Sequence, residues 1–157
     1  MKDLVETLDR RADFWDRPDG DWGAGVPEFD VTQEMRRHAN SCYRMGSLAL
    51  ARQDWRFAER WLCRAMEADH PGAWFRFAAL VCSRGAKVFG GDGHGAYVRY
   101  LVEGAAGFGH GDAQRMRPLL TNRSAALPPF TSWEDPDYGP DVLATLRSGL
   151  AEPPATP

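Results

Sequence analysis

The sequence predicts an all-α protein built from helical hairpins that stack on one another, with a capping helix at each end. Three observations lead to this prediction: apolar residues recur at three- and four-residue spacing, proline and glycine cluster between these stretches, and one stretch repeats itself forty residues later. The chain has 157 residues, 43% hydrophobic and 26% charged, which suits one domain with one core. We divide it into an N-terminal cap helix and strap (1–30), repeats (31–120) and a C-terminal strap and cap helix (121–157).

The N-terminal part is expected to form two helices joined by a strap or linker. Residues 2–15 place their apolar side chains on one face of an amphipathic helix. Residues 16–30 contain two prolines and three glycines, which break helices. A second helix is expected over 32–52, with Asp30 or Thr32 as its N-cap.

Proline and glycine also mark the boundaries in the rest of the chain. Pro71 suits the first turn of a helix, and residues 85–95 hold five glycines and read as a flexible loop. Pro118 is expected to kink or end its helix, because proline removes an amide donor and clashes with the preceding turn. Residues 124–140 resemble a second aromatic strap. The remaining helices are expected over 55–68, 71–85, 96–106, 111–117 and 141–150.

Two units of this chain share a set of motif residues. Residues 61–73 align without gaps with residues 101–113, which pairs His70 with His110 at the same turn. The motif residues are Met45-Gly46, Gln53-Asp54-Trp55, Ala58, Ala65 and His70-Pro71 in the first unit, and Phe77-Ala78, Gly85, Gly91-Asp92-Gly93, Ala105, Ala106, Gly109, His110, Ala113 and Gln114 in the second. This pattern resembles the SEL-like repeats, the longer-period branch of the tetratricopeptide-repeat superfamily.

The resemblance covers about half of the chain, residues 39–117, and implies a right-handed α-solenoid fragment of two units and part of a third. Gln53 stands where the family has a turn glycine. The stacking logic places Trp61 in the core between helices, where truncation to alanine is expected to cost about 3–5 kcal/mol. The paired histidines are expected to stabilise equivalent turns rather than to bind a metal.

The resemblance also implies a function, that of an interaction adaptor which binds a peptide or a partner protein in a concave groove. The implied groove positions are Asn40, Tyr43, Ser47, Phe75, Ala79 and Arg115. The alternative at this point is that the aromatic straps 14–30 and 128–138 already fill the groove, with Trp22, Trp133 and Tyr138 as internal ligands.

Two other classes of function stay open. A small enzyme or ligand-binding protein would use the glycine-rich loop 85–95 and His94, since Gly91–Ala96 touches a dinucleotide-binding pattern before a helix, although no strand precedes it. A nucleic-acid-binding protein would use the stripe of Arg52, Arg56, Arg60 and Arg64, but this reading is disfavoured because long repeat arrays are needed to read RNA. No cofactor and no metal are expected, and the three cysteines read as reduced, buried thiols.

Charge is distributed unevenly along the chain. Residues 1–30 carry nine acidic and four basic side chains, whereas residues 31–130 carry eight acidic and fourteen basic ones. We expect the acidic ends to neutralise the basic middle by docking back. The acidic start and the absence of a long apolar run favour a cytoplasmic location with no membrane contact, and the excess of arginine over lysine suggests a bacterial source. The sequence leaves homodimer formation open.

Overall fold

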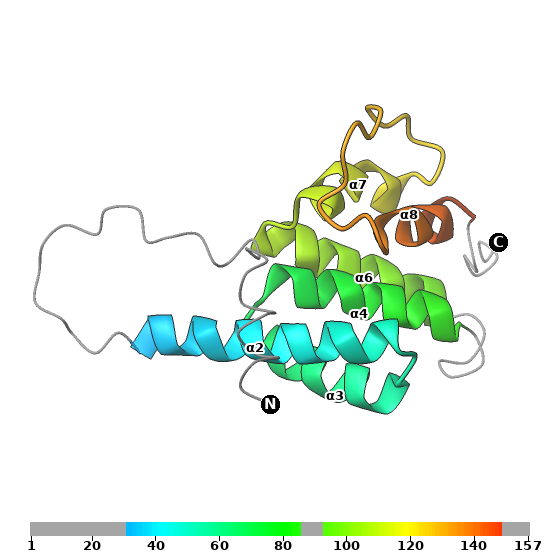
Figure 1. Cartoon of the computed structure of the whole chain (residues 1–157). Coiled ribbons are helices and arrows are strands. Elements are labelled where there is room, and N and C mark those ends of the chain that lie inside the picture. The colour runs from blue at the N-terminus through cyan, green and yellow to red at the C-terminus, as the bar shows by residue number, and fades with distance from the viewer. Residues whose placement is uncertain (1–30, 86–92, 149–157) are drawn as a thin grey trace, which may run out of the picture.

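The computed structural model describes residues 31–85 and 93–148, and within these residues the chain is helical with no strand (Figure 1). The all-α prediction is confirmed. The helices expected before residue 31, and residues 86–92 of the glycine-rich loop, lie outside the described residues. The six described helices are α2 (Val31–Ala51), α3 (Trp55–Met66), α4 (Pro71–Arg84), α6 (Gly93–Phe108), α7 (Gly111–Thr121) and α8 (Gly139–Ser148).

Consecutive helices pack against one another, and α8 folds back onto earlier ones. α2 packs along α3, α3 along α4, α4 along α6 and α6 along α7, while α8 contacts α4, α6 and α7 (Figure 1). One core joins these helices, because its largest fully buried apolar side chains come from five of the six. They include Leu62, Phe75, Leu101, Met116 and Val142.

The observed helices agree with the expected ranges to within two residues, except at the start of α6 and the end of α7. Thr32 lies inside the first turn of α2 and so is not its N-cap, and α6 begins at Gly93, three residues before the expected start. The helix does not end at Pro118, one of the two outcomes expected there, because α7 continues to Thr121. The burial of Leu119, which is 1% exposed, stabilises the extra turn and offsets the cost of the proline.

The turns before α4 and α7 have the same backbone pattern. His70 N donates to Ala65 O at 3.2 Å, and His110 N donates to Ala105 O at 2.9 Å. Asp69 (φ 57°) and Gly109 (φ 106°) precede them in the left-handed region, as expected in the Schellman motif that ends many helices. The forty-residue offset found in the sequence is therefore also an offset between two turns of like geometry.

The two histidines then cap the helices that follow. His70 Nδ1 accepts from Ala73 N at 3.3 Å, and His110 Nδ1 accepts from Ala113 N at 3.4 Å. Both rings are buried, and each stacks on an aromatic ring from the preceding helical pair: Tyr43–His70 at 4.3 Å and Phe75–His110 at 4.1 Å between centroids. Their expected turn-stabilising role is confirmed.

Trp61 does not lie in the centre of the core. Its side chain is only partly buried and borders a surface hollow, whereas the adjacent Leu62 is fully buried and contacts α2 at Gly46. The expected core position of Trp61 was therefore wrong by one residue, a rotation of about 100° around the helix. We expect truncation of Leu62, not of Trp61, to carry the larger stability cost.

Candidate functional site

The six positions implied to line a concave groove are largely buried by the chain itself. Phe75 and Ala79 are 0% and 1% exposed, and Asn40 and Tyr43 are 3% and 7% exposed. Ser47 is partly buried and its hydroxyl donates to Tyr43 O at 2.7 Å. These side chains therefore form part of the packed interior and do not line an open groove.

The sixth position, Arg115, contacts both its own helix α7 and the C-terminal strap. Its guanidinium pairs with Asp112, donates to Ser132 O at 2.7 Å and lies 4.5 Å from the centroid of Phe130, which stacks on Trp133. The side chain is thus already engaged within the chain.

The C-terminal strap covers α4 through a buried ion pair. Arg76 Nε lies 2.7 Å from Asp135 Oδ2, and the carboxylate is 3% exposed. The same guanidinium lies between two tyrosine rings, 5.0 Å from the centroid of Tyr43 and 5.3 Å from that of Tyr138. Residues 128–138 therefore pack on α4 and α7 through Arg76 and Arg115, beside the positions implied for the groove, while residues 14–30 lie outside the described residues.

His94 has no acid or thiol partner among the described residues, whereas Cys42 Sγ lies 3.5 Å from His38 Nε2. His94 is 3% exposed and its Nε2 lies 2.9 Å from the carbonyl oxygen of Val81, so it contacts backbone rather than an acid or a thiol. Burial raises the pKa of Cys82 to about 11 and also raises the pKa values of Cys42 and Cys63, which disfavours a reactive thiolate. Nowhere in the described ranges do three potential metal ligands gather.

The described helices are all too short or too polar to span a bilayer.

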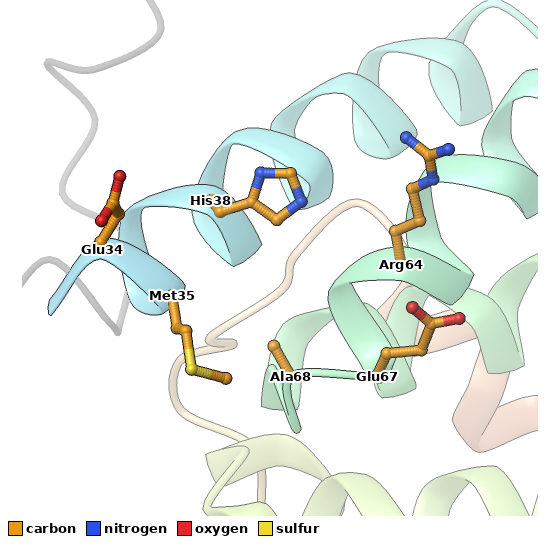
Figure 2. Close-up of a pocket in the computed structure, with 6 residues that line it drawn as sticks. All are labelled: Glu34, Met35, His38, Arg64, Glu67 and Ala68. Carbon is orange, nitrogen blue, oxygen red and sulfur yellow. The ribbon is translucent and has the colours of Figure 1, made fainter. Parts of the chain in front are cut away.

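Two surface hollows lie on α2 and α3. One hollow of about 520 Å³ lies between the start of α2 and the end of α3, and Figure 2 shows Met35 and His38 on one side of it and Arg64 and Ala68 on the other. A second hollow of about 210 Å³ lies at the opposite end of the pair. We name this surface the hairpin groove, and its lining is Glu34, Met35, His38, Arg64, Glu67 and Ala68 at one end and Met45, Leu48, Ala49, Arg52, Asp54, Phe57 and Trp61 at the other.

Helical spacing explains why these side chains share one face. Along α2, Met35, His38 and Met45 follow at steps of three and seven residues, and along α3 Phe57, Trp61 and Arg64 follow at steps of four and three. The core of α3 uses another side of the helix, through Ala58, Leu62 and Ala65. Both helices therefore carry two apolar faces, of which only one is covered by the described residues.

Large apolar side chains in this groove are strongly exposed. Met35 is 56% exposed, Met45 41% and Phe57 51%. Exposed apolar side chains gathered on one face indicate an interaction surface rather than scattered surface residues.

Helical spacing alone does not separate this face from the core, because Met35, Ala39, Cys42 and Met45 recur along α2 as one apolar set. The available signal was the width of that apolar set, because a helix that is apolar on two sides needs a packing partner on each side.

The edge of the hairpin groove is basic. Arg52, Arg56, Arg60 and Arg64 are all exposed, and none forms an ion pair within the described residues. Glu59, which lies among them, does not neutralise them by a direct contact. Arg64 instead lies 5.3 Å from the centroid of the Trp61 ring. The groove thus combines apolar side chains with charges of both signs, because Glu34, Asp54 and Glu67 also line it.

The chain matches no protein-family model, no curated protein and no solved structure.

Proposed function

We propose that this protein is a protein-interaction module of the SEL-like repeat type, which receives an amphipathic helix of a partner in the hairpin groove. The observation that carries this proposal is the exposed apolar lining, with Met45 41% and Phe57 51% exposed on adjacent helices that border one hollow. A groove between two helices, with apolar side chains repeating every three or four residues, suits the apolar face of a third helix.

The repeat assignment is supported by the two like turns. Each ends a helix with a left-handed residue, caps the next helix with a histidine, and stacks that histidine on an aromatic ring, Tyr43 or Phe75. In repeat proteins each unit contacts only its neighbours, so the outermost unit presents a face that nothing in the stack covers. The hairpin groove is such a face on α2 and α3.

The length and lining of the groove define the kind of partner. Its lining is apolar with charges of both signs, Arg52 and Arg64 beside Glu34, Asp54 and Glu67. The span from Met35 to Ala51 along α2 is about 24 Å, the length of a helix of about 16 residues. We therefore expect the partner segment to be an amphipathic helix of four to five turns.

The six positions implied by the family resemblance are not part of this proposal. Binding there would require the strap and α8 to leave α4, which would expose Val142 and Leu146 from the core. It would also break the buried contact of Arg76 with Asp135.

The test compares two exposed aromatic residues on different helices. The full-length chain carrying Phe57→Glu, in the hairpin groove, is compared with the chain carrying Tyr100→Glu, on α6, where the side chain is 60% exposed. Affinity capture from the cell of origin should recover the same partner with the wild type and with Tyr100→Glu and lose it with Phe57→Glu. A partner recovered equally by both variants would refute the groove as the binding surface.

Nucleic-acid binding is a second candidate, favoured by one observation, the exposed and unpaired arginine stripe of residues 52–64. If it is the function, affinity for a mixed-sequence RNA or DNA should fall steeply as salt rises, with a slope that decreases when Arg56 and Arg60 are replaced by glutamine. Absence of binding at low salt would eliminate this candidate.

A further inference from the structure

We infer that residues 2–15 of the same chain dock as a helix in the hairpin groove. This inference uses the same groove as the proposed function, and a partner that binds there would present a similar apolar helix face. The inference does not depend on whether such a partner exists.

The groove and the segment have matching apolar patterns. The groove offers Met45, Leu48, Phe57 and Trp61 at one end and Met35 at the other, all on one side of the α2 and α3 pair. The segment carries Leu4, Val5, Leu8, Ala12 and Trp15, which share one face if residues 2–15 are helical. Docking would remove both apolar faces from water, which is the main source of stability for such contacts.

Charge does not select this occupant, because most of the acidic side chains lie in the linker. Residues 2–15 hold four acidic and three basic side chains, whereas residues 16–30 hold five acidic and one basic. Arg52 and Arg64 line the groove beside Glu34, Asp54 and Glu67. The matching apolar faces and the reach of the chain therefore carry the inference.

The chain between the two parts is long enough for this docking. A helix over residues 2–15 is about 21 Å long, which fits within the groove length of about 24 Å along α2 from Met35 to Ala51. The fifteen residues 16–30 connect it to the start of α2 at Val31. Such a connection spans up to about 50 Å when extended, so the helix can reach the groove from the start of α2 in either direction.

The test places a photo-crosslinker in the groove of the full-length chain. Benzoylphenylalanine replaces Phe57, and in a matched protein it replaces Tyr100, which is equally exposed but lies on α6. After irradiation, mass spectrometry should find Phe57-site crosslinks to residues 2–15 of the same molecule, with a yield independent of protein concentration. The Tyr100-site crosslinker should give no such product.

Two variants of the segment complete this experiment. Leu8→Glu places a charge on the apolar face and should abolish the crosslink, whereas Arg10→Glu places the same residue on the opposite face and should leave it intact. Amide hydrogen exchange over residues 2–15 should accelerate about tenfold or more in Phe57→Glu and remain unchanged in Tyr100→Glu. The inference is refuted if the Phe57 site crosslinks only to a second copy, if it gives no product with residues 2–15, or if Leu8→Glu has no effect.

The outcome separates this inference from the proposed function. If residues 2–15 occupy the groove and a partner competes for it, Leu8→Glu should increase partner capture severalfold. If the crosslink forms but Phe57→Glu leaves capture unchanged, the groove holds only the chain's own helix and the proposed function fails. If capture depends on Phe57 but the crosslink to residues 2–15 is absent, the proposed function stands and this inference fails.

Discussion

At the scale of single residues, the helix ends of this protein place unfavourable residues in the left-handed region. Gln53 adopts φ 59° at the end of α2, where Gln53 N donates to Leu50 O and Asp54 N donates to Ala49 O. This is the same Schellman pattern that ends α3 at Asp69 and α6 at Gly109. Only the last of the three turns has the residue that adopts this conformation without steric cost.

We expect Gln53→Gly to stabilise the protein. Removing the side chain relieves a left-handed strain of about 1–2 kcal/mol, and the greater entropy of unfolded glycine offsets part of it, so the free energy of unfolding should rise by about 0.5–1 kcal/mol. Asp69→Gly should gain less, because aspartate tolerates this region better than glutamine. Urea denaturation of both variants measures the difference. A loss of stability in Gln53→Gly would contradict this account of the turn.

The two capping histidines should make stability sensitive to mild acid. Burial lowers the pKa of His70 to about 3 and that of His110 to about 4. Below the unfolded pKa of about 6.5, the unfolded chain binds protons that the folded chain does not, so stability is retained above pH 6.5 and is lost as the pH falls towards 4. Between pH 7.5 and 5 the two residues together should remove about 4 kcal/mol from the free energy of unfolding.

The control is the double variant His70→Asn and His110→Asn, which keeps a good N-cap side chain but does not titrate. Its stability should be lower than that of the wild type at pH 7.5, because the contacts with Tyr43 and Phe75 are lost. Its additional loss between pH 7.5 and 5 should nevertheless be smaller. Chemical denaturation at each pH measures the free energy of unfolding of both proteins. An equal loss of stability in the two would rule out the histidines as the source of the pH dependence.

At the scale of helices, glycine sets how closely neighbouring elements pack. A Cβ atom added at Gly46 of α2 would lie 2.7 Å from Leu62 Cγ and 3.0 Å from the Leu62 backbone nitrogen. A Cβ atom added at Gly104 of α6 would lie 2.4 Å from the Trp74 ring. By contrast, nothing lies within 4 Å of a Cβ atom at Gly107.

Alanine at these glycines should therefore change stability in opposite directions. Gly46→Ala should lower the free energy of unfolding by about 1–3 kcal/mol, since α2 and α3 must separate slightly. Gly107→Ala should raise it by up to about 1 kcal/mol through better helix propensity. Thermal denaturation of the two variants checks both signs, and a stabilised Gly46→Ala protein would show that the contact with Leu62 does not limit the packing.

The sequence predicts most of the helices because their signals are local. Apolar spacing locates α2, α3 and α4 to within a few residues, and the repeated histidine identifies two turns that the structure builds alike. The continuation of α7 past Pro118 could not be read locally, since it depends on the burial of Leu119 against other elements. The same limit explains the error at Trp61, where spacing alone does not say which side of a doubly apolar helix meets the core.

At the scale of the whole molecule, the candidate site could be predicted only in part, because long-range contacts decide which face stays open. Arg76 and Asp135 are 59 positions apart in the sequence, and no local sequence pattern predicts their contact. This contact and its neighbours turn the implied groove into interior. What the sequence does carry is the apolar stripe of Leu4, Val5, Leu8, Ala12 and Trp15, on which the inference about residues 2–15 depends.

The closure of the molecule by its C-terminal strap should depend on one buried carboxylate. Asp112 is 0% exposed, and it accepts from Glu134 N at 3.1 Å and from Asp135 N at 2.8 Å while pairing with Arg115. Through this side chain, and through Arg115, which donates to Ser132 O, α7 holds the strap that positions Asp135 against Arg76 of α4. Loss of the acceptor leaves a buried backbone donor without a partner, which costs more than the bonds themselves.

We expect Asp112→Ala to lower the free energy of unfolding by about 3 kcal/mol or more. The control is Glu103→Ala, which removes an exposed ion pair with Arg117 and should change stability by less than about 1 kcal/mol. Hydrogen exchange then shows where the loss is felt. In Asp112→Ala the amides of residues 132–148 should exchange faster than in the wild type, while those of α2 and α3 change less. Uniform acceleration of exchange throughout the chain would mean that the strap and the core unfold as one unit. Because α8 buries Val142 and Leu146 against the earlier helices, unchanged exchange over 132–148 would mean that α8 alone holds the strap in place.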